Sequence, residues 1–152
     1  MAQDLFNIAP AFYGMSMVPQ ASWVDYGFAL LIIAGSDGEV SDPEMEWLTI
    51  ELAEALGVDE KIVAAWEEYD FDEEPLAEVF AKIDSRSVAS YSKLLLYDAI
   101  RMSYADDEYA KSEREKVGEA AIMLNVDKDT VLGIEALVEQ ERALEKLRAI
   151  IL

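Results

Sequence analysis

The chain of 152 residues contains no cysteine and no histidine. The lack of cysteine excludes disulfides and thiolate nucleophiles. Without either residue type, the chain also has no Ser-His or Cys-His catalytic pair and none of the usual zinc, copper or haem ligand sets. Carboxylate and other hard oxygen ligands are the metal chemistry that remains. Cysteine usage says nothing here about the cellular compartment.

Basic residues are scarce as well, with 12 against 32 acidic residues and a net charge of −20. Residues 1–76 hold 17 acidic residues and one base, Lys61, whereas residues 77–152 hold 15 acidic and 11 basic residues, so the net charges are −16 and −4. Such a field repels nucleic acid and anionic lipid surfaces and attracts cations and basic protein partners. An acidic surface that serves solubility alone would show the same balance.

Long apolar runs are absent. The longest, Phe28 to Ala34, is far too short to cross a bilayer, so we expect no direct membrane insertion. No basic residue precedes Lys61, so the charged start of a signal peptide is missing, and we expect a cytoplasmic protein. A chain of this length with 53% hydrophobic residues fits one core. We therefore predict a single domain over residues 20–152, preceded by an N-terminal arm or short helix over residues 1–19.

A nine-residue acidic stretch occurs twice, at residues 36–44 and 105–113. In each copy an Asp-x-Glu is followed by a Glu seven residues after the Asp, which gives Asp37, Glu39, Glu44 and Asp106, Glu108, Glu113. Each copy follows an apolar run of helical character and precedes another helical segment. The pattern predicts that a helix, acidic turn, helix unit has been duplicated, and that the two turns occupy equivalent places in one domain, where they can be adjacent.

Helical periodicity extends through most of the chain, and no segment shows sustained strand alternation. We predict an all-α, compact bundle of about seven helices built around the duplicated unit. The expected helix starts are capping residues: Ser22 before a central helix to about Ala34, Ser41 with Glu44 as a capping box, Asp59, Ser112 with Glu115, and Asp127 before a last helix to Leu152. We expect residues 67–75 to form an acidic connecting loop, in which the aromatic side chains of Tyr69 and Phe71 pack against the domain.

The two acidic segments with their flanks, 34–44 and 97–113, resemble the acidic helix-turn-helix segments of the TerB-like family, named for tellurite resistance. The resemblance covers roughly residues 20 to 145. It implies an all-helical domain whose acidic residues bind a divalent cation, in proteins tied to metal or oxyanion stress or fused to partners such as membrane-anchored J-domain co-chaperones. Two departures bear on the second turn: Asp107 stands where the first copy has Gly38, and the first copy has one more residue before its closing Leu-x-Val-Asp.

The six motif carboxylates could supply the oxygen ligands that calcium or magnesium prefers. The turn is not an EF-hand, because Asp42 replaces the glycine at the sixth position and Leu48 replaces the bidentate Glu at the twelfth. Helix dipoles and capping favour Glu44 and Glu113 without any ion. That alternative stays open, although it accounts less well for the recurrence of Asp-x-Glu. No motif for a substrate cleft is present, so we expect no enzyme activity and no organic cofactor.

Two functions follow as hypotheses. The first is a cation-binding TerB-like domain that acts in a tellurite or metal-stress response. The alternative is a non-catalytic scaffold or adaptor that binds a basic protein partner through the acidic N-terminal half.

The last helix has an apolar stripe that includes Leu137, Leu144 and Ile151 at intervals of seven. We expect this stripe to pack on the domain's own helices, with a homodimer seam as the rival. Because the large negative charge of each subunit opposes pairing, a monomer or weak homodimer is predicted.

Overall fold

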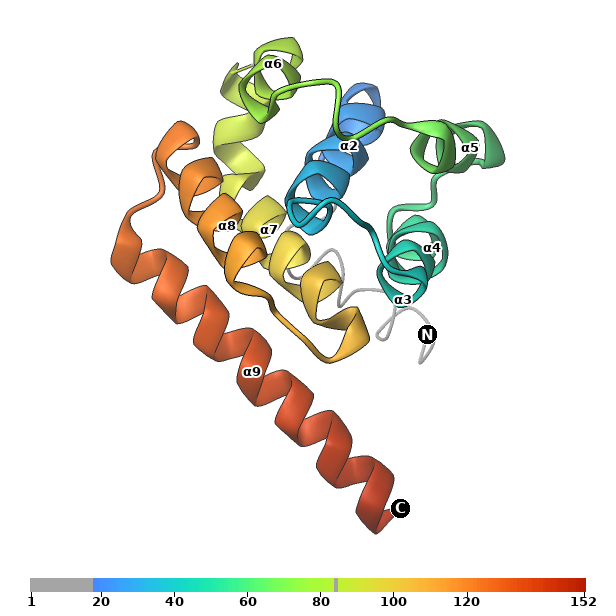
Figure 1. The fold of residues 1–152 in the computed structure, drawn as a ribbon, viewed down its shortest axis with the longest axis vertical. Helices are drawn as coiled ribbons and strands as arrows, with labels where there is room; N and C mark the ends of the chain where they lie inside the picture. Colours follow the sequence, from blue (N-terminus) through green and yellow to red (C-terminus); the bar gives the residue numbers. More distant parts are fainter. Residues whose placement is uncertain (1–17, 84) are drawn as a thin grey trace.

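The computed structural model describes residues 18–83 and 85–152. Over these residues the chain is all-α, a compact bundle of seven helices without strands, as the periodicity predicts (Figure 1). The bounds are α2 (Trp23–Ala34), α3 (Asp42–Glu46) continued by the π-helical segment η3 (Trp47–Leu52) and α4 (Ala53–Leu56), α5 (Glu60–Glu68), α6 (Leu76–Lys82), α7 (Ser85–Ser103), α8 (Lys111–Met123) and α9 (Lys128–Ile151). Short 3-10 turns, η2 (Gln20–Ser22) and η4 (Tyr104–Asp106), precede α2 and follow α7.

Most of the predicted arm, residues 1–17 of 1–19, lies outside the described residues. The domain boundary at residue 20 stays a prediction. No helix in the described part of the chain has the length and apolar character needed to cross a membrane.

The core is organised around α2, which packs on α5, α6 and α7. Its residues from Leu30 to Ala34 are buried on every side, as the continuous apolar run predicts. Gly27 in the middle of this helix lets α5 approach: a Cβ there would lie 2.1 Å from the indole nitrogen of Trp66. That nitrogen instead donates a hydrogen bond to the Val24 carbonyl at 3.2 Å. A mid-helix glycine, costly for helix formation by itself, is thus required by packing.

The acidic loop between α5 and α6 is held on the core by its aromatic residues. Tyr69 stacks on Phe28 of α2 with ring centroids 3.8 Å apart, and its hydroxyl donates to Glu74 at 2.7 Å. Phe71 lies against Gly35, where a Cβ would come within 2.5 Å of its ring. The prediction that these aromatics find a surface to bury against is confirmed.

Three of the predicted helix caps form as expected: the side chains of Ser41, Asp59 and Asp127 accept the amide hydrogens of Glu44, Ile62 and Thr130. Ser22 precedes α2, but its side chain makes no capping hydrogen bond. The predicted cap at Ser112 is wrong. Helix α8 begins earlier, at Lys111, because the Glu113 carboxylate accepts the amide hydrogen of Ala110 and fixes the first turn there.

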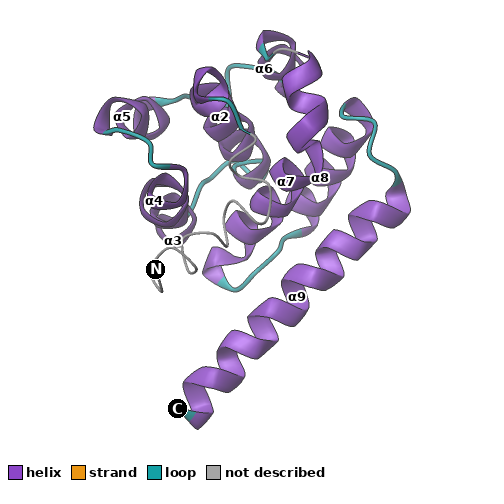
Figure 2. Ribbon diagram, turned by 180° about the vertical axis from the view of Figure 1, so that it is seen from behind, coloured by secondary structure: helices purple, strands orange, loops and turns teal. Residues whose placement is uncertain are grey.

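The expectation for the last helix is only half right. Val131 and Val138 of α9 are buried on the domain, where α9 packs on α7 and α8. The C-terminal end of α9 runs past the other helices of the bundle, which Figures 1 and 2 show from opposite sides. Leu144, Leu147 and Ile151 are 47%, 51% and 67% exposed there. Periodicity correctly indicated an apolar face, but the domain does not cover all of it.

Candidate functional site

The first acidic turn, residues 36–41, connects α2 to α3. Asp37 accepts the amide hydrogen of Glu39 at 3.1 Å, and both carboxylates are exposed. Gly38 has a φ of +97°, which glycine adopts without strain. Glu44 behaves differently: it is 3% exposed, and its Oε1 accepts the amide hydrogen of Ser41 at 2.8 Å. The turn therefore separates two exposed acids from one buried acid.

The second acidic turn, residues 105–110, makes the same local hydrogen bonds. Asp106 accepts the amide hydrogen of Glu108 at 3.2 Å, and Glu113, 2% exposed, accepts that of Ala110 at 2.8 Å. Asp107 occupies the place of Gly38 with a φ of 67°, a left-handed conformation that Asp tolerates better than most residues. The residue change thus leaves the backbone path intact. The matching geometry agrees with a duplicated unit, while duplication itself stays a prediction.

Folding brings the last Glu of each turn together. The carboxyl groups of Glu44 and Glu113 lie close enough to act on each other's pKa as hydrogen-bond partners, and a hydrogen bond between two carboxyl groups requires one proton between them. Burial raises the pKa of both groups above the usual range. For Glu113, burial and then the hydrogen bond to Glu44 raise the pKa to about 9, with the nearby charge of Asp106 acting in the same direction. The pair therefore holds a proton at neutral pH.

The other predicted ligands do not join this pair into a ready-made site. Within residues 18–83 and 85–152, no three acidic side chains are arranged to hold a metal ion. Asp37, Glu39 and Glu108 point to solvent from their turns. Asp106 is exposed but close enough for its charge to act on both buried carboxyls. The donor chemistry fits a hard divalent cation, whereas the number of converging ligands falls short of the six or more oxygens that calcium takes.

A second feature of the same region is tethering of the second turn to α9. Arg142 donates to the Tyr104 carbonyl at 2.9 Å and to the Asp107 carboxylate at 2.5 Å, and Lys146 lies 3.9 Å from Asp107. The guanidinium also lies over the Tyr104 ring. Asp107, which the sequence marked only as a departure from the first turn, is thus the residue through which α9 holds that turn.

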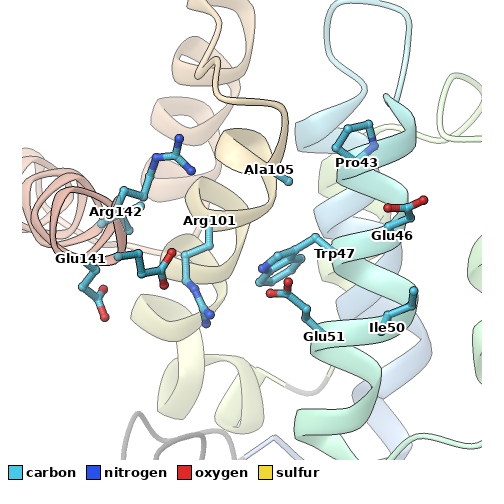
Figure 3. Close-up of a pocket in the computed structure, with 11 residues that line it drawn as sticks. Pro43, Glu46, Trp47, Ile50, Glu51, Arg101, Ala105, Glu141 and Arg142 are labelled. Atoms are coloured by element: carbon cyan, nitrogen blue, oxygen red, sulfur yellow. The ribbon is translucent and has the colours of Figure 1, made fainter. Parts of the chain in front are cut away.

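Beside the turns, a groove of about 410 Å³ separates the α3–η3 helix from α9. We call it the α3–α9 groove, and Figure 3 shows the residues that line it. One wall is formed by Pro43, Glu46, Trp47, Ile50 and Glu51, the floor by Arg101 of α7 and Ala105 of η4, and the other wall by Val138, Glu141, Arg142 and Glu145 of α9. The Arg101 guanidinium lies between the Trp47 and Tyr97 rings, 5.4 and 5.1 Å from their centroids. Sequence reasoning missed this groove, since residues from three distant segments form it.

Sequence reasoning also missed a buried carboxyl behind the groove. Asp98 of α7 is fully buried, accepts the Tyr26 hydroxyl hydrogen at 2.5 Å and lies 3.5 Å from Arg101. Burial raises its pKa to about 6, partly offset by Tyr26 and Arg101. The one available signal was an acidic residue within the apolar run from Leu94 to Met102. Asp98 lines neither the α3–α9 groove nor two further cavities of the described residues, and its bond to Tyr26 joins α7 to α2.

Comparison with known proteins gives one informative similarity. No family model matches the chain, and the comparison with curated proteins finds no match. Among solved structures, the chain resembles a tellurite resistance protein from Nostoc punctiforme, with a TM-score of 0.71 and 28% sequence identity over 84% of this chain and 77% of that one. The match confirms the resemblance predicted from the acidic segments: this chain has the fold of a tellurite resistance protein and resembles the TerB-like proteins.

Proposed function

We propose that this chain is a non-catalytic TerB-like domain that binds a divalent cation between its two acidic turns and acts in a tellurite or metal-stress response. The observation that carries the proposal is the meeting of Glu44 and Glu113, one from each turn, as a buried pair of carboxyl groups that raises the pKa of Glu113. Two carboxyl groups brought together in a buried place are costly for stability unless a proton or a cation lies between them.

A cation would take the place of that proton. With the proton lost, Glu44 and Glu113 supply two anionic oxygens, and Asp106, whose charge already acts on both, is the nearest further ligand. Calcium and magnesium prefer such oxygen ligands. Binding would release a proton and so strengthen as the pH rises. The remaining motif acids, Asp37, Glu39 and Glu108, would attract the ion to this face of the domain.

The absence of catalysis is part of the proposal. A carboxyl with a raised pKa is the kind of group that general acid catalysis uses. However, neither Glu44 nor Glu113 lines the α3–α9 groove or two further cavities on the described surface, so none of these three cavities places an organic substrate beside the pair. The link to a stress pathway is supported by the tellurite resistance protein whose fold this chain shares.

The alternative is an adaptor that binds a basic protein partner without an ion. It is favoured by the first turn, where no ion pair among the described residues joins Asp37 or Glu39 to a basic side chain. Such binding would weaken steeply with added salt. Substitution of Glu113 would not change the affinity for such a partner, because this residue is buried.

Thermal unfolding with added cations tests the proposal. Calcium or magnesium should raise the melting temperature more than sodium does at matched ionic strength, because a ligand of the folded state stabilises it by mass action. The shift should disappear in Glu113→Gln and shrink in Asp106→Asn. Glu115→Gln, an exposed position on the same helix, is the control and should respond like the parent chain. Equal shifts in Glu113→Gln and Glu115→Gln would overturn the proposal.

A further inference from the structure

Two uncovered features lie next to each other at the C-terminal half of α9. The first is the α9 end, residues 143–151, whose last part extends past the bundle (Figures 1 and 2). Its aliphatic residues Leu144, Leu147, Ile150 and Ile151 are 47% to 82% exposed. Single exposed aliphatic side chains are ordinary, but four on nine residues of one helix form a contiguous apolar surface of the kind that marks an interface.

The second feature is the α3–α9 groove, which opens beside this helix end. Ile50, which is 54% exposed, gives it apolar surface, whereas Trp47 in the same wall is 7% exposed. The wall formed by η3 is π-helical, a local departure from the α-helix that is frequent at functional sites. The volume of about 410 Å³ suits a few large aliphatic side chains rather than a whole domain.

We propose that the occupant of the α3–α9 groove is the α9 end of a second copy of this chain. The two copies pair reciprocally about a two-fold axis, with their α9 helices antiparallel, so that each helix end enters the groove of the other. Leu147, Ile150 and Ile151 of one copy then cover the exposed Ile50 of its partner. The two-fold axis buries both uncovered surfaces, because each copy contributes its helix end to the partner's groove and its groove to the partner's helix end.

The charges of the two surfaces are complementary. The arginines of the groove are already engaged, Arg101 with the Trp47 and Tyr97 rings and Arg142 with the second turn. The charges left on its rim are acidic: Glu46, Glu51 and Glu145, all exposed. Residues 143–151 carry Arg148 and Lys146, which lies 3.9 Å from Asp107 but keeps a side chain that is 67% exposed, against Glu145 alone. The helix end is thus a locally basic and apolar segment on an acidic chain, which is the chemistry that the groove fits.

The net charge limits the strength of the pairing. Two subunits of −20 each repel one another, and added salt screens that repulsion. The dimer should therefore form at protein concentrations on the order of 100 µM and tighten between low and physiological salt. This assembly is independent of the proposed cation site, since neither Glu44 nor Glu113 lines the groove.

Cysteine cross-linking tests the arrangement cleanly, because the chain has no cysteine of its own. Glu51→Cys and Arg148→Cys are made as separate chains and mixed under mild oxidation. The mixture should give the mixed disulfide dimer in several-fold excess over a mixture of Arg148→Cys with Ile122→Cys. Ile122 is 81% exposed on α8 and lines no wall of the groove, so it is the matched control. Equal yields from the two mixtures would overturn the proposal.

Sedimentation equilibrium supplies the second measurement. The parent chain should shift from monomer to dimer with concentration, Leu147→Glu and Ile50→Glu should each remove the shift, and Ile122→Glu should retain it. All three positions are at least half exposed, so the variants are expected to fold, and circular dichroism checks their helicity. A monomer at every concentration contradicts the proposal. Slow reaction of monomeric Glu51→Cys with a soluble thiol reagent also contradicts the proposal, because the groove would then be covered by the same chain.

Discussion

The two acidic turns have the same backbone path but different surroundings. Each sends one Glu inward and caps itself with an Asp. The second turn is held by Arg142 and Lys146 of α9 through Asp107, whereas the first has Gly38 at that position and no side chain to hold. The inner glutamates therefore define what the turns share. Only the second turn has contacts with α9. The basic side chains of α9 offset negative charge at that turn, whereas the negative charge of the first turn is not offset.

Removing an inner carboxyl should have the largest effect. Glu44→Ala and Glu113→Ala each leave an amide hydrogen without its acceptor and a buried partner without its hydrogen bond, so each should lower the free energy of unfolding by about 2 kcal/mol. Urea titration measures the loss, with Glu115→Ala as control. If one variant lost stability and the other did not, the two turns would not be equivalent at their inner residues.

The pH dependence of stability should report the shared proton. The pKa of Glu113 is raised to about 9 by burial and the bond to Glu44, so the folded state holds a proton that the unfolded state loses above about pH 4.5. This contribution is complete below that pH and is lost as the pH rises toward 9, with a slope of at most about 1.4 kcal/mol per unit.

The diagnostic quantity is the difference between the parent chain and Glu113→Gln. Asp98, whose pKa is raised to about 6, and the net charge of −20 add slopes of the same sign to both proteins. The variant should therefore lose part of the slope between pH 6 and 9 and gain relative stability at the alkaline end. Parallel curves over that range would mean that Glu44 and Glu113 share no proton.

Loosening the second turn should have the smallest effect. Arg142→Ala removes contacts with the Tyr104 carbonyl and with Asp107, a partly exposed set worth about 1 kcal/mol. Hydrogen exchange should speed up at residues 105–110 and stay unchanged at residues 36–41. Lys128→Ala, at the other end of α9, is the control. Faster exchange in both turns would contradict the asymmetry.

Local signals in the sequence carry much of this fold. The apolar run from Phe28 to Ala34 and the caps at Ser41, Asp59 and Asp127 depend on neighbouring residues only, so the helices they predict are present. The inner glutamates could also be named, because capping and repetition both mark them. That they touch each other could not be derived, since contact across 69 positions depends on how the helices pack.

Other features have no local signal. Periodicity identifies an apolar face on α9 without saying what covers it, and so the exposed end past residue 142 was not expected. The π-helical turn at Trp47 shifts the register of a helix that reads as continuous. The tether at Asp107 joins residues 35 positions apart, and only the packing of α9 brings Arg142 to it.

The central claim is that a divalent cation replaces the proton shared by Glu44 and Glu113. Calorimetric titration with calcium at pH 7, in two buffers of different ionisation enthalpy, counts the protons released on binding. We predict about one proton per ion for the parent chain and no comparable release from Glu113→Gln. No binding, or binding of equal strength in both proteins without proton release, would contradict the account.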